Sequence, residues 1–309
     1  MTVLTIGNFD GVHLGHQAIL ARARRVGDRV VALTFDPHPA ATLRPGSEPA
    51  RLSTRADKIQ RLRRAGADEV VVLEPTRELL GQTAEQFVAG LVRRYGPAAI
   101  VEGPDFRFGK GRAGDLAMLE QLGREHGFAV HVVPRVRTVL SDRLVAPVSS
   151  SLVRWLVAGG RVMDAALTLG AGFALAGAVT RGEQRGRELN VPTANLDPAD
   201  WAGHVVPGDG VYAGIVELAG GARHGAALSV GVKPSFGEHR LTIEAHLLDF
   251  TGDLYGQRIR IAFARWLRDQ YAFPDAATLR RQLQRDVART RRWAELGLLE
   301  APAMVAEAG

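Results

Sequence analysis

One short stretch near the N-terminus carries the strongest local signal in the chain: Gly7-Asn8-Phe9-Asp10-Gly11-Val12-His13-Leu14-Gly15-His16. It follows an apolar run, Val3 to Ile6, that is typical of a β-strand, and it opens a helical pattern. Glycines let backbone approach a ligand closely, and the free N–H groups at a helix start attract phosphate. His13 and His16 are three residues apart and can donate to the same phosphate oxygens. The stretch therefore predicts a nucleotide or phosphate site.

Two plainer interpretations of this stretch stay open from the residues alone. The glycines can form a simple turn that carries two surface histidines, or the histidines can be a metal pair. No nearby histidine or carboxylate completes a metal-ligand spacing, which makes the metal pair the weaker alternative. A lone H-x-G-H pattern is ambiguous, and it is the preceding strand with Gly7 to Gly11 that favours a nucleotide.

Outward from this stretch, the first half of the chain alternates apolar runs with helical patterns. Strands are expected at Val3–Ile6, Val30–Phe35, Val70–Leu73, Ala98–Glu102 and Phe128–Val133. Helices are expected after the start signals at Thr54 and Thr83, the second with Gln86 as a capping box, and around Leu116 to Leu122. This alternation predicts a doubly wound parallel sheet with helices on both faces, whose ligands bind beyond the carboxyl ends of the strands.

After about residue 170 the pattern changes to short strands separated by Gly, Pro, Asn and Asp. Strands are expected at Phe173–Thr180, Val211–Glu217, Ala226–Val230, Thr242–Leu248 and Arg258–Phe263. Such a run predicts a small antiparallel barrel. Apolar residues at helical spacing between Asp275 and Leu299 predict a terminal helix that packs on it. We therefore expect domains at residues 1–148 and 171–300, joined by a helical linker at 149–170.

Composition limits the class of protein. The 309 residues suggest about two domains, and 46% apolar with 23% charged residues is ordinary for a soluble globular chain. No apolar run reaches the ~18 residues that span a bilayer, and no signal-peptide pattern is visible, so we expect a cytoplasmic protein. The absence of cysteine excludes a disulfide framework, a cysteine nucleophile and a thiolate metal site.

The basic residues are unusual in kind. Of the 39 lysines and arginines only Lys58, Lys110 and Lys233 are lysine, the other 36 are arginine, and the net charge is +6. A bias toward GC-rich codons explains most of this excess, whereas phosphate recognition by guanidinium groups is the functional alternative. Many arginines lie on helical faces that look like solvated surface. The arginines that stand inside motifs, and that we expect to matter, are Arg107, Arg112, Arg154, Arg185 and Arg187.

Three further motifs in the first half are compatible with a nucleotide site. Asp36-Pro37-His38-Pro39 is a rigid strand exit, and alone it indicates no more than a proline turn. The loop from Asp105 to Arg112 is basic, aromatic and rich in glycine, so it can stack on a ring and neutralise phosphate, or be a solvated loop. Ser149-Ser150-Ser151 indicates a helix N-cap, with Arg154 one turn later.

In the second half, the stretch from Arg181 to Asn195 is typical of a flexible basic loop that runs into a strand initiated by Pro192. It can be a surface hairpin, or its glycines can form a flap over ATP. Thr193 and Asn195 then offer oxygen ligands of the kind that Mg²⁺ prefers. Glu244 lies in an apolar alternating strand, where a charge is costly unless it is paired, used or turned to solvent. No G-x-x-x-x-G-K-[ST] P-loop occurs.

Taken together, these motifs resemble the prokaryotic bifunctional riboflavin kinase/FAD synthetases. The H-x-G-H motif is similar to that of the nucleotidylyltransferases, and Asp36–Pro39, Asp105–Arg112, Ser149–Arg154 and Pro192–Asn195 follow in the family's order over almost the whole chain. The resemblance implies ATP-dependent phosphorylation of riboflavin to FMN in the second domain. It implies adenylyl transfer from ATP to FMN in the first domain, giving FAD and pyrophosphate, with Mg²⁺ as cofactor.

The resemblance also implies roles for individual residues. Catalytic roles fall to His13, His16, Asn195 and Glu244, with Glu244 as the base that takes the riboflavin 5′-hydroxyl proton. Thr193 and Asn195 would hold the metal. Residues implied to bind ATP are Gly7, Asn8, Phe9, Asp10, Gly15, Ser149, Ser150, Ser151, Arg154, Arg185, Gly186 and Arg187. Residues implied to bind flavin are Asp36, His38, Pro39, Asp105, Phe106, Arg107, Phe108, Arg268 and Tyr271. His246 is expected to be structural.

The chain departs from the family pattern at a few positions. Asn190-Val191 precedes Pro192 where relatives carry Gly with Phe or Ile, and Lys233, Ser235 and Ser151 also differ. These departures bear on the kinase more than on the adenylyltransferase. One alternative is a divergent paralogue with one activity or a modified flavin substrate. Another is an arginine-rich nucleic-acid-binding protein, against which stand an aromatic content of 6% and no binding-module signature. We expect small-molecule partners, no membrane, and a monomer or weak homo-oligomer.

Overall fold

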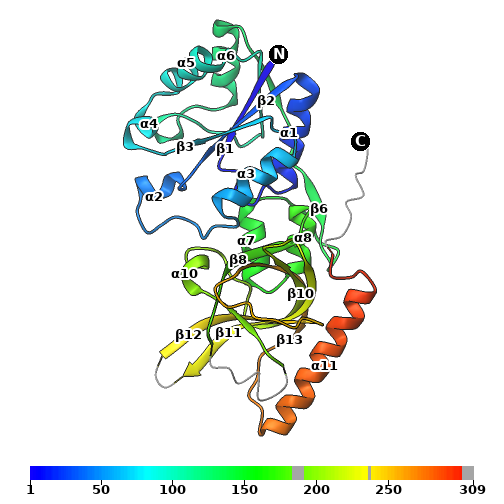
Figure 1. Cartoon of the computed structure of the whole chain (residues 1–309). Coiled ribbons are helices and arrows are strands. Elements are labelled where there is room, and N and C mark those ends of the chain that lie inside the picture. The colour runs from blue at the N-terminus through cyan, green and yellow to red at the C-terminus, as the bar shows by residue number, and fades with distance from the viewer. Residues whose placement is uncertain (183–190, 236–237, 301–309) are drawn as a thin grey trace. The chain divides into compact units, whose positions relative to one another are not determined.

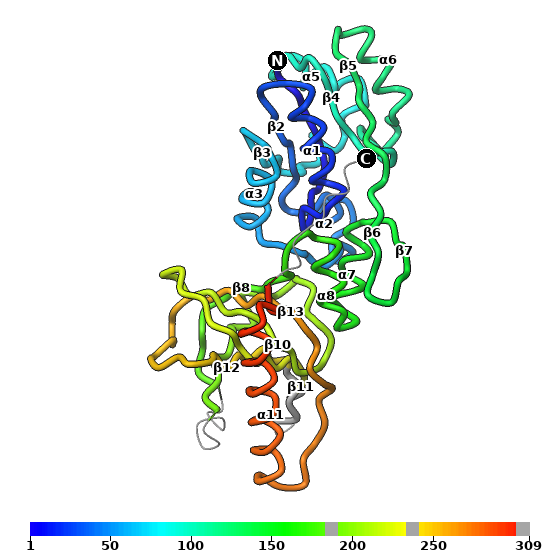
Figure 2. The backbone as a smooth tube through the Cα atoms, turned by 90° about the vertical axis from the view of Figure 1, so that its right-hand side faces the viewer, coloured from blue at the N-terminus to red at the C-terminus, as the bar shows by residue number. Residues whose placement is uncertain are grey.

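The computed structural model describes residues 1–182, 191–235 and 238–300, with the backbone alone at 233–235 and 238–240. The chain forms two compact units (Figures 1 and 2). The first contains Met1–Thr138 and Ala146–Ser150, and the second contains Val139–Val145 and the chain from Ser151 onward. No helix in the described residues is both long and apolar enough to cross a bilayer.

The first unit is built on a parallel sheet of five strands, in the order β3-β2-β1-β4-β5. The strands are β1 (Thr2–Gly7), β2 (Arg29–Phe35), β3 (Glu69–Leu73), β4 (Ala99–Glu102) and β5 (Ala129–Val132). Each lies within one or two residues of a strand expected from the sequence. The strand order reverses between β1 and β4, and in such sheets the ligand crevice opens at the carboxyl ends of these two strands.

Helices cover both faces of this sheet, as the alternating pattern predicts. Apolar residues of α1 (Leu14–Val26) and α3 (Arg55–Arg64) share one core, and those of α5 (Ala84–Tyr95) and α6 (Leu116–His126) share the other. Thr54 and Thr83 cap α3 and α5, the second through a complete capping box. Shorter helices interrupt the loops: α2 (Pro39–Leu43), α4 (Arg77–Gly81) and the 3₁₀ turn η1 (Lys110–Arg112).

Short elements form the part of the sequence that follows the strands of the parallel sheet and precedes those of the barrel. The strands β6 (Arg137–Val139) and β7 (Val145–Pro147) form a two-stranded sheet. The helices α7 (Ser150–Ala158) and α8 (Val162–Leu169) follow. Inside the second unit, the buried Asp164 of α8 accepts a hydrogen bond from the Ser141 backbone N–H at 2.7 Å and pairs with Arg161. This buried carboxylate therefore fixes the tip of the β6–β7 hairpin on α8.

The second unit is a closed antiparallel barrel of six strands, in the order β10-β11-β12-β9-β8-β13. Its strands are β8 (Phe173–Thr180), β9 (Ala194–Leu196), β10 (Gly210–Leu218), β11 (Arg223–Ser235), β12 (Glu238–Leu247) and β13 (Arg258–Arg268). Side chains alternate between a buried interior and an outer face, as along β8, and Phe173, Tyr212 and Phe263 pack together inside. A short helix, α10 (Pro198–Trp201), follows β9. The small antiparallel barrel expected from the sequence is confirmed.

The terminal helix α11 (Ala276–Glu295) lies along the outside of the barrel, where it contacts β11 (Figure 1). An ion pair between Arg268 at the end of β13 and the buried Asp286 of α11, at 2.9 Å, holds it in place. The sequence prediction of a terminal helix on the barrel is confirmed. Because α11 covers part of the outer face, outward-pointing residues of β11 that contact it lie beside a helix.

Candidate active sites

In the first unit, the stretch after β1 turns sharply before α1 begins at Leu14. Phe9 and Val12 both have φ of 45° and Gly11 has φ of 79°, a conformation that costs most residues energy. The turn is fixed by buried contacts: both carboxylate oxygens of Asp10 accept from the Leu52 backbone N–H, at 3.0 and 3.1 Å. The loop backbone is therefore held in one shape at the ligand end of the sheet.

The two histidines of this loop stack on each other. Their ring centroids are 3.6 Å apart with an angle of 17° between the planes. His13 caps α1, and its Nδ1 accepts from the His16 backbone N–H at 3.4 Å, so a neutral His13 carries its proton on Nε2. A side chain at position 15 would lie 3.2 Å from the His13 ring, which explains why the motif has Gly15 there.

The electrostatic setting keeps His16 neutral. Burial, then the neighbouring His13 and Lys58, hold the pKa of His16 well below its usual value. Its Nδ1 atom is buried and has no hydrogen-bond partner in the described part of the chain. Buried polar atoms without a partner are rare in folded proteins, which sets the His16 ring apart from an ordinary surface histidine.

The other residues predicted to bind ATP here divide into three groups. Gly7 ends β1, and Phe9 makes an edge-on contact with the His16 ring, so both shape the loop. Asp10 and Ser150 tie segments together, because the Ser150 hydroxyl donates to the Asp10 carbonyl at 2.9 Å. Ser149 precedes α7, and Ser151 and Arg154 lie in its first turns within the second unit.

The segment after β2 lies beside this loop. The Asn8 amide nitrogen is 3.1 Å from Nε2 of His38, and Nδ1 of His38 caps α2 by accepting from the Ala40 N–H at 3.1 Å. Pro39 is the first residue of α2, and Asp36 follows the last residue of β2. The structure therefore brings the Asp36–Pro39 motif against the histidine loop, although the two are more than 20 residues apart in the sequence.

The aromatic loop after β4 is more occupied by protein contacts than the sequence suggests. Phe108 is buried in a core of the sheet and stacks on Phe106 with ring centroids 5.4 Å apart. Asp105 pairs with Arg135, which holds the pKa of that carboxyl below its usual range. Arg107 donates to the Phe106 carbonyl at 2.8 Å. Phe106 is the residue of this predicted flavin loop whose ring is least committed to the core.

Two residues at this site were missed by the sequence reasoning. Lys58 of α3 and Glu102 of β4 are both buried, with 7% and 3% of their surfaces exposed. Glu102 accepts from the Ile6 N–H at 2.7 Å across the gap between β4 and β1, and burial raises the pKa of its carboxyl well above the usual value. Neither residue stands in a motif. The only sequence feature that could have drawn attention to either residue is that Lys58 is a lysine, whereas almost every other basic residue is arginine.

In the second unit, three predicted residues converge on the outer face of the barrel. Asn195 of β9 lies directly opposite Glu244 of β12 in the strand ladder. The Thr193 hydroxyl donates to the Glu244 carboxylate at 3.3 Å. His246, two residues along the same face, donates from Nδ1 to the Pro192 carbonyl at 2.8 Å, which fixes the start of the Pro192–Asn195 segment.

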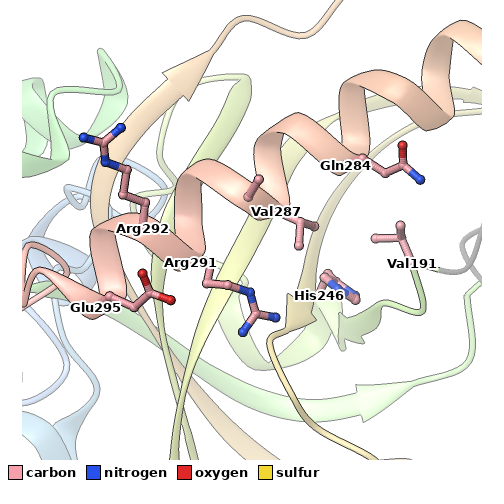
Figure 3. A pocket seen from close by; sticks show the side chains of 8 residues that line it. Val191, His246, Gln284, Val287, Arg291, Arg292 and Glu295 are labelled. Carbon is pink, nitrogen blue, oxygen red and sulfur yellow. The ribbon is translucent and has the colours of Figure 1, made fainter.

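Two cavities flank these residues. One, of about 340 Å³, lies between the barrel and one face of α11, where His246 and Val191 oppose Gln284, Val287 and Arg291 (Figure 3). The other, of about 90 Å³, reaches from Thr193 to Tyr255. The larger cavity was missed because the stripe of α11 that lines it was interpreted as core only.

The remaining predicted residues of this unit lie elsewhere or outside the described part. Arg268 pairs with Asp286, and its guanidinium lies 5.1 Å from the centre of the Tyr271 ring. Neither lines the larger cavity. Arg185, Gly186, Arg187 and Asn190 lie outside the described residues, as do the side chains of Lys233 and Ser235.

Hard oxygen donors are available for a metal ion. Thr193 and Asn195 contribute a hydroxyl and an amide oxygen beside the Glu244 carboxylate, which suits Mg²⁺. Among the described residues, no group of three or more histidine and carboxylate side chains is placed to hold a metal by itself. A Mg²⁺ ion at this point would therefore depend on additional ligands, such as phosphate oxygens of a nucleotide.

Comparison with known proteins agrees with both halves of this description. Residues 1–145 match the FAD synthetase family, and residues 169–294 match the riboflavin kinase family. The bifunctional riboflavin kinase/FMN adenylyltransferase of Pseudomonas fluorescens is 37% identical over 94% of this chain and 92% of its own length. The Escherichia coli K12 enzyme of the same name is 34% identical over 92% of this chain and 90% of its own.

A solved structure from Streptococcus pneumoniae, described as a macrolide-efflux protein, has a TM-score of 0.84 and 29% identity over 94% of both chains. The resemblance inferred from the motifs is therefore confirmed at the level of family, domain order and fold. The chain belongs to the bifunctional riboflavin kinase/FMN adenylyltransferase family.

Proposed function

We propose that the two units catalyse consecutive ATP-dependent steps, riboflavin to FMN at the outer face of the barrel and FMN to FAD at the histidine loop. The observation that carries the proposal is the contact of Thr193 with Glu244 beside Asn195. These residues come from two separate segments, β9 with its preceding residues and β12, and the sequence predicts a kinase role for each of them. The stacked histidines with an unpartnered Nδ1 atom support the second step in the same way.

In the kinase step, the Glu244 carboxylate takes the proton of the riboflavin 5′-hydroxyl. The hydroxyl oxygen forms a bond to the γ-phosphorus of ATP while the bond from that phosphorus to ADP breaks, and ADP leaves with the electron pair. Thr193 orients the carboxylate through its 3.3 Å hydrogen bond. Mg²⁺, held by Thr193, Asn195 and the phosphates, would supply neutralisation of the charge on the nucleotide.

The larger cavity is the place we propose for the flavin ring. It begins at His246, two residues from Glu244 on the same strand face, which is about 7 Å along a strand. Val191 and Val287 give it apolar walls, and the Gln284 amide gives it a hydrogen-bond donor for a ring carbonyl. The smaller cavity beside Thr193 is then left for the nucleotide. Arg268 and Tyr271 stay predicted flavin contacts, and Arg185 and Arg187 stay predicted ATP contacts.

In the adenylyltransferase step, an oxygen of the FMN phosphate attacks the α-phosphorus of ATP. The bond from the α-phosphorus to the pyrophosphate breaks, and pyrophosphate leaves with the electron pair. No proton has to be removed from the nucleophile, so the work of the site is positioning and charge stabilisation. His13 would donate from Nε2 to phosphate, and the His16 ring stacked on it would add a second donor.

The proposed domain limits are residues 1–148 for the adenylyltransferase, 149–170 for the helical linker and 171–300 for the kinase. ATP is a substrate of both reactions, which supports a cytoplasmic location. The proposed partners are nucleotides and flavins, without nucleic acid or membrane, and the proposed state is a monomer or weak homo-oligomer.

Product analysis of the full chain tests this function. The protein is incubated with ATP and Mg²⁺ and with either riboflavin or FMN, and products are separated by chromatography. We expect FMN and then FAD from riboflavin, and FAD from FMN. No FMN from riboflavin would overturn the kinase assignment and favour a paralogue with one activity; no FAD from FMN would overturn the adenylyltransferase assignment.

A further inference from the structure

Lys58 is a buried lysine that the reaction scheme above does not use. It lies in the first turn of α3 with 7% of its surface exposed. Its ammonium donates to the Phe35 carbonyl at 2.7 Å and to the Asn8 carbonyl at 3.3 Å. Phe35 is the last residue of β2, and Asn8 follows the end of β1. The side chain therefore joins two neighbouring strands at the edge where ligands bind.

These two carbonyls belong to the two loops of the adenylyltransferase site. Asn8 starts the segment that contains Asp10, His13 and His16, and Phe35 immediately precedes the Asp36–Pro39 motif. The Lys58 charge also contributes to the low pKa of His16. A single ammonium group thus contacts the backbone of both loops and acts electrostatically on His16.

The placement of Lys58 is costly. Burial of an ammonium group is unfavourable, and the first turn of a helix repels positive charge. Burial lowers the pKa of Lys58, and Arg51 and Arg55 act in the same direction, whereas Asp36 and Asp10 act against them. An ammonium has three donors, and only two have acceptors among the described residues. Holding the two carbonyls together therefore leaves one donor of the ammonium group for a ligand.

We infer that Lys58 is a positioning residue for adenylyl transfer, which holds the two loops by their carbonyls and supplies a fixed positive charge to the phosphates exchanged between ATP and FMN. The inference rests on the proposed adenylyltransferase function. It explains why a lysine is present in a chain where 36 of 39 basic residues are arginine. A compact ammonium can contact two carbonyls at one point, whereas a planar guanidinium spreads its donors over a larger fork.

Charge removal tests this inference. In Lys58→Met the chain keeps an unbranched side chain without the ammonium, and we expect kcat for FAD formation from FMN to fall about 100-fold, as for loss of one preorganised donor. FMN formation from riboflavin, measured on the same sample, should stay unchanged. The matched control is Arg63→Met, which removes an exposed charge from the same helix and should leave both rates unchanged.

A chemical variant separates charge from packing. Because the chain has no cysteine, Lys58→Cys introduces its only thiol, which can be alkylated in the unfolded protein before refolding. Aminoethylation restores an ammonium at nearly the length of lysine, and carboxamidomethylation gives a neutral group of similar size. We expect the first adduct to recover FAD formation to within about tenfold of wild type carried through the same refolding, and the second to stay about 100-fold down.

The pH profile gives an independent readout. The sulfur of the aminoethyl adduct makes its amine less basic than lysine, so the alkaline fall of kcat should move to lower pH than in wild type. Equal activity of the two adducts, or wild-type FAD formation by Lys58→Met, would overturn the inference and leave the adenylyltransferase assignment intact. Absence of FAD formation in the wild type would instead overturn the proposed function itself.

Discussion

The histidine loop and the outer face of the barrel fix their functional residues in different ways. Around the histidines, side chains hold the backbone in place, because Asp10, Ser53 and Lys58 bind loop N–H and carbonyl groups. Several residues of this loop also have positive φ. On the barrel, Asn195 and Glu244 are fixed by the strand ladder, and hydrogen bonds from Thr193 and His246 add to it.

The difference shows what each chemistry requires. Adenylyl transfer needs no proton removal from its nucleophile, so the site depends on loops that surround phosphates. Phosphorylation of a hydroxyl needs a base, and the base that we propose, Glu244, is a single carboxylate on a rigid strand. We therefore expect the barrel site to depend on one side chain and the loop site to depend on the residues that shape its backbone.

Glu244→Gln should give a larger effect than changes in the loop backbone, the α11 cavity or the stability of the fold. It keeps the shape of the side chain and its contact with Thr193 but removes the base, and FMN formation should fall about 1,000-fold. FAD formation from added FMN serves as the internal control and should not change. A Glu244→Gln enzyme with near-normal FMN formation would mean that the base lies elsewhere.

Asp10→Ala tests the loop site through a residue that holds the backbone. It leaves the buried Leu52 N–H without its acceptor and frees the loop, so FAD formation should fall about 100-fold from misplacement alone. The counterpart on the barrel, His246→Ala, should reduce FMN formation far less, because the ladder still holds Glu244. Steady-state rates on both variants decide this, and equal losses would remove the distinction between the two sites.

Val287→Trp sharpens the position of the flavin on the barrel. The larger ring should fill the cavity between α11 and β12, and the KM for riboflavin should rise about tenfold while the KM for ATP changes little. Arg285→Gln, on the exposed side of α11, is the matched control. An unchanged KM for riboflavin would place the flavin ring outside this cavity.

The smallest expected effect is on stability at mild acid pH. The pKa of folded His16 lies well below 6.5, so the unfolded chain binds a proton there first, and stability should fall as pH drops below 6.5. The slope for one proton is at most about 1.4 kcal/mol per pH unit. Denaturant unfolding of wild type and His16→Phe between pH 5 and 7 isolates this contribution, which the variant should lack.

The comparison of wild type with His16→Phe also removes the contribution of Glu102, whose effect on the pH dependence of stability is opposite to that of His16. The raised pKa of Glu102 means that the folded state binds a proton more tightly, so its contribution is complete below about 4.5 and is lost as pH rises. Because Glu102 is present in both proteins, its contribution cancels in the difference. A difference between the two proteins that does not vary with pH would show that His16 is not held neutral by the fold.

The architecture could be predicted because the same local sequence signals recur along the chain. Strand and helix periods, the Thr83 capping box and the turn residues each recur, and they lead to the sheet and the barrel that the structure shows. The strands β11 and β12 are longer than expected, because they extend into a polar hairpin whose residues lack the apolar alternation that defined them. The short β9 was expected only as a strand after Pro192.

The candidate sites were predictable only where residues form motifs. Asp10 carries no sign in the sequence that its carboxylate binds the Leu52 N–H, since that partner is 42 residues away. Lys58 and Glu102 are single residues whose importance comes from burial, which a sequence pattern with mixed neighbours does not show. The α11 cavity depends on the distance between a helix and a strand, and the apolar residues that line it look the same as core.

Complementation between two variants tests the central claim, that the chain holds two separate sites for consecutive steps, most directly. His16→Ala should make FMN but not FAD, and Glu244→Ala should make FAD from FMN but not FMN from riboflavin. Neither alone should convert riboflavin to FAD. Mixed in one tube with riboflavin, ATP and Mg²⁺, they should restore FAD formation, because FMN released by one is used by the other. No FAD from the mixture, or FAD from either variant alone, would contradict the account.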